Sequence, residues 1–233
     1  MINRIPFSSL YIADHGWLKS RFHFSFAEYR NPDNINFGAL RVMNDDLVQV
    51  QTGFGTHPHK DMEIITYVVR GELSHEDSMH NKESLGRGCI QYLSAGTGLT
   101  HSEMNDGHKE VRFIQTWIVP KANNLKPNYG SKCFDKSERH NKWLHLVGPE
   151  NSDAAIFIYQ DASMYVSEVD SNKSLNFDVE KECQVYIKIL EGSAVINDMT
   201  FEYGDAAEIM DESIEINAST DLHLLLIQMK KEA

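Results

Sequence analysis

Residues 55–63 read Gly-Thr-His-Pro-His-Lys-Asp-Met-Glu, and residues 96–105 read Gly-Thr-Gly-Leu-Thr-His-Ser-Glu-Met-Asn. Each stretch carries a pair of potential metal ligands two residues apart, His57 with His59 and His101 with Glu103. Side chains alternate between the two faces of a β-strand, so both members of each pair would point the same way. Two such strands facing one another would surround a single ion.

Three imidazoles and one carboxylate are a donor set that suits a first-row divalent metal and leaves positions free for water, substrate or dioxygen. Fe, Mn, Co, Ni, Cu and Zn all accept these donors, so the pattern does not name the ion. The positive charge of such a centre favours the deprotonated form of a phenol or enol that binds through oxygen. Glu103 then has two candidate roles: it stays ligated, or it detaches and takes the substrate's hydroxyl proton as a general base.

The rest of the chain reads as short β-rich segments separated by Gly, Asn and Asp turn signals, and long amphipathic helix patterns are scarce. The predicted strands are 40–42, 64–69, 90–93, 111–119, 155–159, 184–190, 193–196 and 222–228. Residues 67–71 and 188–192 each form a strand closed by a turn glycine, and both are followed by a second glycine-led strand. This internal echo indicates an all-β fold built by duplication.

These residues resemble those of a known superfamily. His57, His59, Glu63 and Gly71 fit the first cupin motif, and Gly98, His101 and Asn105 fit the second. More narrowly, the first 120 residues are similar to the pirin family, whose members are bicupins. The similarity rests on Gly16-Trp17-Leu18, on 24–26 with Tyr29, and on the blocks 55–63, 94–103 and 115–120.

The pirin resemblance implies two cupin barrels, of the double-stranded β-helix or jelly-roll type, in one chain. We expect a metal-binding N-terminal cupin domain over 1–120, a linker over 121–142, and a C-terminal cupin-like domain over 143–233 that lacks the metal site. The second half supports this division, because beyond residue 145 its only histidine is His223 and residues 211–216 are acidic and apolar in alternation.

The same resemblance implies a ligand set of His57, His59, His101 and Glu103, and it favours iron. Glu63 would then support His57 or His59 through a hydrogen bond, or cap its strand. The implied activity is that of a quercetin 2,3-dioxygenase, which cleaves the central ring of a flavonol with O2 and releases carbon monoxide. The expected partners are therefore a small aromatic, flavonol-like substrate and O2.

Two other functions stay open at this point. Pirin-like proteins are also implicated as regulators, which would make the chain a metal-containing module that binds a protein partner and has no physiological enzymatic activity. A metal-dependent isomerase or another small-molecule cupin enzyme would turn over a substrate without consuming oxygen.

Composition excludes several classes of partner. The chain has 22 basic and 34 acidic side chains, a net charge of −12, which would repel nucleic acids and anionic membranes. No apolar run approaches the roughly 20 residues of a membrane span. The N-terminus lacks a secretory pattern and the three cysteines are scattered, so we expect a cytoplasmic protein. We also expect the protein to be a monomer. Cys89 should be buried and inert, and His75, His80 and His108 should be surface histidines.

Overall fold

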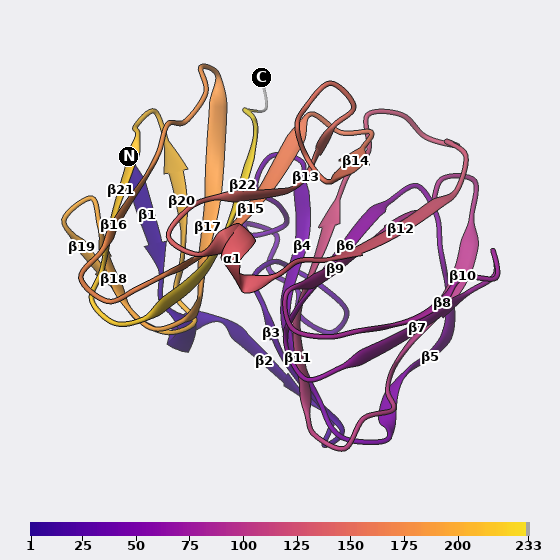
Figure 1. Ribbon diagram of the computed structural model, residues 1–233. Helices are drawn as coiled ribbons and strands as arrows, with labels where there is room; N and C mark the ends of the chain where they lie inside the picture. Colours follow the sequence, from indigo (N-terminus) through magenta and orange to yellow (C-terminus); the bar gives the residue numbers. More distant parts are fainter. Residues whose placement is uncertain (232–233) are drawn as a thin grey trace. The chain divides into compact units, whose positions relative to one another are not determined.

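The computed structural model describes residues 1–231, and β-strands dominate it, as the sequence predicts (Figure 1). The chain divides into two compact units. The N-terminal unit comprises Tyr11–Phe134, and the C-terminal unit joins Met1–Leu10 to the chain from Asp135 onward. Each unit contains one seven-stranded and one four-stranded sheet.

In the N-terminal unit the large sheet has the strand order β12-β9-β6-β11-β4-β3-β2, and the small sheet has the order β5-β10-β7-β8. The strands are β2 (Tyr11–Asp14), β3 (Leu18–Phe22), β4 (Leu40–Val48), β5 (Thr52–His59), β6 (Glu63–Arg70), β7 (Leu73–Asp77), β8 (Lys82–Leu85), β9 (Cys89–Ser94), β10 (Leu99–Asn105), β11 (Val111–Ile118) and β12 (Asn128–Cys133).

In the C-terminal unit the large sheet has the order β1-β20-β17-β22-β15-β13-β14, and the small sheet has the order β16-β21-β18-β19. Its elements are β1 (Ile2–Ile5), the 3-10 helix η1 (Phe7–Ser9), α1 (Lys136–Arg139), β13 (Leu144–Pro149), β14 (Ile156–Ile158), β15 (Ala162–Val169), β16 (Ser174–Phe177), β17 (Cys183–Glu191), β18 (Ala194–Ile196), β19 (Met199–Phe201), β20 (Ala206–Met210), β21 (Ile214–Ala218) and β22 (Leu222–Lys230).

The two units repeat one topology. The order β9-β6-β11-β4 in the first large sheet corresponds to β20-β17-β22-β15 in the second, and β5-β10-β7-β8 corresponds to β16-β21-β18-β19. Gly71 and Gly192, the turn glycines of the internal echo, follow the equivalent strands β6 and β17 at φ +81° and +80°. The duplication predicted from the sequence is therefore present strand by strand.

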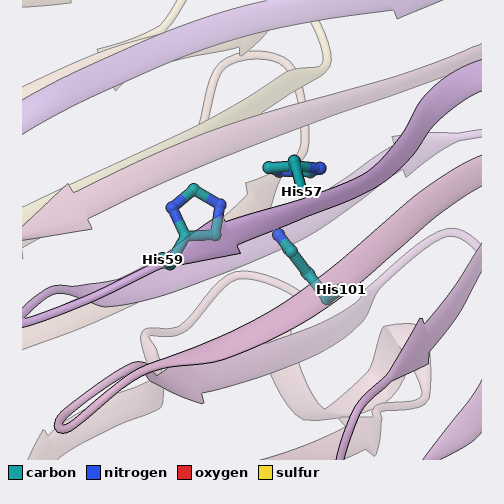
Figure 2. A group of neighbouring side chains, drawn as sticks. All are labelled: His57, His59 and His101. Carbon is teal, nitrogen blue, oxygen red and sulfur yellow. The ribbon is translucent and has the colours of Figure 1, made fainter.

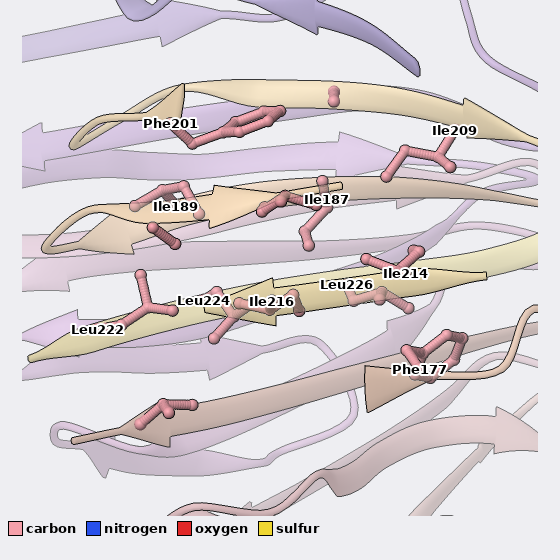
Figure 3. Close-up of a cluster of buried hydrophobic side chains, with 14 of the residues drawn as sticks. Phe177, Ile187, Ile189, Phe201, Ile209, Ile214, Ile216, Leu222, Leu224 and Leu226 are labelled. Atoms are coloured by element: carbon pink, nitrogen blue, oxygen red, sulfur yellow. The ribbon is translucent and has the colours of Figure 1, made fainter. Parts of the chain in front are cut away.

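An apolar core fills the C-terminal unit between its sheets (Figure 3). Period-two alternation supplies it, because Leu222, Leu224 and Leu226 of β22 point to one face and meet Ile214 and Ile216 of β21. The N-terminal unit has smaller apolar clusters, one around Val68 and Phe113 and another around Ile64. Its interior therefore has polar positions that the C-terminal unit fills with aliphatic side chains.

The two compact units have different residue bounds from the domains predicted from the sequence. Residues 1–10 belong to the C-terminal unit, where Ile2 of β1 pairs with Ile209 of β20 and Arg4 forms an ion pair with Asp205 at 2.6 Å. Residues 121–142 include β12, which pairs with β9 and extends the large sheet of the N-terminal unit. Each large sheet therefore has an edge strand from outside the predicted domain. β1 is an edge strand of the large sheet in the C-terminal unit, and β12 is an edge strand of the large sheet in the N-terminal unit.

Cys89 is buried, as its apolar strand predicts, but it is not an isolated thiol. It forms a disulfide with Cys133 across the β9–β12 pair, and Cys183 is a buried free cysteine. A disulfide is more typical of an oxidising compartment than of the cytoplasm. The cytoplasmic location expected from the scattered cysteines therefore stays a prediction. In the part of the chain that the structure describes, no helix has the length and apolar character needed to cross a bilayer.

The two ligand-bearing strands are hydrogen-bonded neighbours within the small sheet and do not face each other from separate sheets. In the β5–β10 pair His101 lies opposite His57, and the register shifts before Glu103, which lies opposite Phe54. Gly53 permits this close pairing. A Cβ at Gly53 would overlap the Glu103 carbonyl oxygen and lie 2.6 Å from the Met104 Cα, too close for any side chain.

We expect Gly53→Ala to lower the free energy of unfolding by about 1–3 kcal/mol, the usual cost of overpacking. Gly55→Ala is the matched control on the same strand, because a Cβ there meets nothing within 4 Å, and it should change stability by no more than about 0.5 kcal/mol. Denaturant unfolding followed by tryptophan fluorescence measures both. Equal stabilities of the two variants would contradict the close approach of β5 to β10.

Candidate metal centre

Three histidines converge inside the N-terminal unit. His57 and His59 come from β5 and His101 from β10, and their rings turn toward a common point (Figure 2). One potential ligand atom from each lies within 4.8 Å of the other two. The ring centroids are 4.6 Å apart for His57 and His101 and 4.9 Å apart for His59 and His101. Among residues 1–231 this is the one cluster of three or more potential metal ligands.

His59 and His101 are held in the uncharged state that metal binding needs. Burial, followed by the neighbouring His57, lowers the pKa of His101 to about 3 and that of His59 to about 4. His101 is 1% exposed, and neither of its ring nitrogens has a hydrogen-bond partner. A buried polar group without a partner costs free energy, and a metal ion would satisfy the lone pair of a neutral imidazole. The three residues therefore fit a divalent cation.

The tautomer of His57 is set by the backbone. Its Nδ1 lies 2.8 Å from the carbonyl oxygen of Gly55, a distance at which the Nδ1–H donates to that oxygen. The lone pair of a neutral His57 then lies on Nε2. A hydrogen bond of this kind orients a ligating imidazole and raises its basicity.

Glu103 is buried on the same strand as His101 but is not a member of the three-histidine group. One carboxylate oxygen accepts hydrogen bonds from Thr66 Oγ1 at 3.2 Å and Gln91 Nε2 at 2.5 Å, and the other accepts from Gln115 Nε2 at 2.6 Å. Burial raises the pKa of Glu103, while its neighbours act in the opposite direction. Its predicted roles as fourth ligand and base stay predictions.

Glu63 is also outside the group. It is fully buried, and its Oε1 accepts a hydrogen bond from the Tyr92 hydroxyl at 2.9 Å across the β6–β9 pair. Its expected support of His57 or His59 stays a prediction.

His75 is a neighbour of the cluster that the sequence analysis missed. We expected a surface histidine, but His75 is 1% exposed, stacks on Tyr129 at 4.5 Å, and lies 5.4 Å from His101 between ring centroids. Its Nε2 lies 3.2 Å from Asp77. The signal available was the alternation of Leu73, His75 and Asp77, which all point inward from β7. Because the residues beside His75 in the sequence are polar, the segment resembles an exposed turn and the buried position of His75 was not predicted.

A cavity of about 320 Å³ opens beside the histidines, and its apolar lining exceeds its polar lining. His57, His59 and Glu103 line it together with five aromatic side chains, which are Trp17, Phe22, Phe26, Phe54 and Trp117. Trp117 packs edge-on against His59 at 4.9 Å and against Phe26 at 5.3 Å. Phe22 is buried and, together with Phe26, contributes to a wall of this cavity.

The equivalent strands of the C-terminal unit carry different side chains. β21 corresponds to β10, and its inward residues Ile214, Ile216 and Ala218 are buried in the apolar core. β16 corresponds to β5 and contributes Phe177 to the same core. His223 is buried on β22, with Nδ1 at 3.3 Å from Glu191.

Comparison with known proteins identifies both halves of the chain. A family model described as Pirin matches residues 7–118, and one described as Quercetinase C-terminal cupin domain matches residues 145–229. These matches confirm the predicted pair of cupin domains. The chain is 41% identical over 229 residues to a protein of Caulobacter vibrioides named Pirin-like protein, covering 97% of this chain and 99% of the relative.

Matches from Escherichia coli extend over nearly the whole length. The chain is 40% identical over 219 residues to one named quercetin 2,3-dioxygenase in strain K12, covering 93% of this chain and 94% of the relative. The crystal structure of the bacterial pirin YhhW in complex with nickel(II) matches with a TM-score of 0.93 and 36% identity, covering 100% of both chains.

The lowered pKa of His101 predicts a pH-dependent stability of the metal-free protein. Unfolded His101 takes up a proton near its ordinary pKa of 6.5, whereas the folded residue does so only near 3. The unfolded state therefore binds more protons between these values, and His101 lowers stability progressively as the pH falls through this window. Replacing it with glutamine removes that contribution.

We expect the stability of His101→Gln relative to the wild type to rise by up to about 2 kcal/mol between about pH 7 and about pH 5. Denaturant unfolding of both metal-free proteins across this range is the measurement. His108→Gln, at an exposed histidine, is the control and should follow the wild type at every pH. Parallel curves for His101→Gln and the wild type would show that His101 titrates normally.

Proposed function

The chain belongs to the pirin family, and from this membership and its histidine cluster we propose that it is a metal-dependent dioxygenase that cleaves a flavonol such as quercetin with O2 and releases carbon monoxide. The observation that carries the proposal is the convergence of three imidazoles beside an aromatic cavity. A cavity with a largely apolar lining and a few convergent polar groups is typical of a small-molecule site.

We propose that His57, His59 and His101 hold the metal, with Glu103 as the fourth ligand. The family resemblance favours iron, and nickel(II) is the ion named for the E. coli relative. When bound, the metal supplies a Lewis-acidic centre that binds an enol or phenol oxygen and favours its deprotonated form. Metal analysis of the purified protein tests the identity of the ion.

The cavity walls suit a planar aromatic substrate. Trp117 and Phe26 are in edge-to-face contact on one side, and Trp17 and Phe54 form a second such pair at 5.2 Å. Aromatic rings gain from offset or edge-to-face contacts beyond the area they bury.

The surroundings of Glu103 support the proposal that it detaches from the metal and accepts the proton of the substrate hydroxyl. Its burial raises its pKa, and a carboxylate whose conjugate acid has a higher pKa is a stronger base. Gln115 holds one carboxylate oxygen and itself accepts a hydrogen bond from Trp117 Nε1 at 3.1 Å. Since Gln115 and Trp117 both line the cavity, this chain of hydrogen bonds orients Glu103 from the substrate side.

We expect Glu103→Gln to lower the turnover of quercetin by about 10²–10⁴-fold, the usual contribution of a general base, while part of the metal stays bound. Glutamine keeps the shape of the side chain and loses its basicity. Loss of flavonol absorbance under air reports turnover, and elemental analysis reports metal. Near-normal turnover in the metal-loaded variant would remove the role of Glu103 as base.

We expect His57→Ala and His101→Ala to lose both bound metal and the release of carbon monoxide from quercetin, because each removes one of three convergent donors. His108→Ala, at an exposed histidine, should keep both. A wild-type protein that binds metal but neither consumes flavonol nor releases carbon monoxide would contradict the dioxygenase. That result would favour a regulatory module that binds a protein partner, whereas turnover without oxygen consumption would indicate an isomerase.

A further inference from the structure

The wall of the cavity formed by β4 carries two polar side chains that the proposed chemistry does not use. Asn44 and Asp46 are two residues apart, so both project from the same face of β4, and both line the cavity together with His57 and His59. β4 belongs to the large sheet, whereas the histidines belong to the small one. The two polar side chains therefore line the cavity from a different sheet than the metal ligands.

Asn44 has an unsatisfied hydrogen-bonding atom. The residue is 3% exposed, and its Oδ1 has no hydrogen-bond partner. Its cross-strand neighbours are Phe22 on β3 and Gln115 on β11, both of which also line the cavity. Leaving a buried amide oxygen without a donor is costly, so a site that does so is suited to receive a donor from a ligand.

Asp46 is buried in the same wall without a compensating cation. It is 2% exposed, and its cross-strand neighbours are Ser20 and Phe113. The adjacent Asp45 is different, because both of its carboxylate oxygens accept hydrogen bonds from Arg112 at 2.8 Å. Asp45 is therefore held in an ion pair with Arg112, whereas Asp46 lines the cavity.

The protonation of Asp46 makes it a versatile partner for a hydroxyl group. Burial raises its pKa to about 7; a contact with Ser20 acts against this, and the charges of Asp45 and Glu103 add to the increase. A carboxyl group in this range accepts a hydrogen bond when ionised and donates one when protonated. A phenolic hydroxyl can serve either form.

We propose that Asn44 and Asp46 form a polar anchor that binds a phenolic hydroxyl of the ligand at the β4 wall of the cavity and thereby orients the ring system. This proposal rests on the proposed function and makes it more specific. The substrate class would be polyhydroxylated aromatics, because a ligand without a hydroxyl at this end would leave the amide oxygen of Asn44 unpaired. Sites that hydrogen-bond a buried substrate hydroxyl reject analogues that lack it.

The experiment compares the dissociation constants of two flavonols with the metal-loaded protein under anaerobic conditions, so that binding is measured without turnover. 3-Hydroxyflavone carries only the enol hydroxyl, and quercetin adds hydroxyls on both outer rings. We expect the wild type to bind quercetin more tightly. In Asn44→Leu that preference should fall by about tenfold, the effect of one hydrogen bond to a buried group, while the affinity for 3-hydroxyflavone stays within about twofold.

Three further variants separate recognition from structure. Asp46→Leu should reduce the preference, and Asp46→Asn should restore most of it, because an amide can still donate and accept. Thr116→Val is the matched control. Thr116 Oγ1 is also buried and unpartnered, but the residue lies between Gln115 and Trp117 on β11 and so points to the other face of the sheet. Its substitution should leave the preference unchanged.

The outcomes distinguish the anchor from the activity. An unchanged preference in folded Asn44→Leu and Asp46→Leu overturns the anchor even if quercetin is turned over normally. Loss of preference in these variants supports the anchor even if aerobic assays detect no ring cleavage, which would overturn the dioxygenase alone. A wild type that binds neither flavonol overturns both. If Asn44→Leu does not fold, Asn44→Ser withdraws the amide and gives the same comparison.

Discussion

The pairing of β5 with β10 is the constraint on which the site depends. Antiparallel register sets His57 directly opposite His101, and His59 lies two residues further along the same face. A slip of one residue would turn every ligand on one strand away from the cavity, because side chains alternate with a period of two. The register shift before Glu103 and the absence of a side chain at Gly53 bring the second pair into the same pocket.

Burial then gives this geometry its chemistry. Three imidazoles crowded together in water would still take up protons near their ordinary pKa, and protonated imidazoles bind no metal. Desolvation lowers the pKa of His59 and His101, so both imidazoles are neutral at physiological pH. The ring nitrogens of His101 have no hydrogen-bond partner among the described residues, so a metal bound there would also stabilise the fold.

The sequence predicts the features that depend on nearby residues. The spacing of His57, His59 and His101 is local, and so is the alternation that marks the strands and the repeated strand and glycine pattern of the two halves. His75 lies beside His101 only because β7 pairs with β10, and Asn44 and Asp46 line the cavity beside Gln115 only because β4 pairs with β11. Such pairings join segments far apart in the chain, and no short-range pattern reveals them.

The boundaries of the compact units also depend on pairings between segments that are far apart in the chain. β1 and β12 are edge strands, and an edge strand is assigned by the sheet that it completes. Because β1 pairs with β20, the first residues of the chain lie in a different unit from the residues that immediately follow them. Composition identifies residues 121–142 as polar, yet polarity is what an edge strand requires as much as a linker does. Only the hydrogen-bond partner distinguishes the two.

The two units share one topology but differ in the side chains that point between their sheets. In the C-terminal unit the inward positions of β21 hold Ile214 and Ile216, which fill the space between the sheets. In the N-terminal unit the equivalent strand carries His101 and Glu103, and β4 of the other sheet carries Asn44 and Asp46, which line the cavity. Such polar substitutions sacrifice apolar packing, and they are stable only when each buried group has a partner. Within residues 1–231 the chain itself provides no hydrogen-bond partner for the ring nitrogens of His101 or for the Asn44 Oδ1. We assign the partner of His101 to the metal and the partner of Asn44 to a hydroxyl of the ligand.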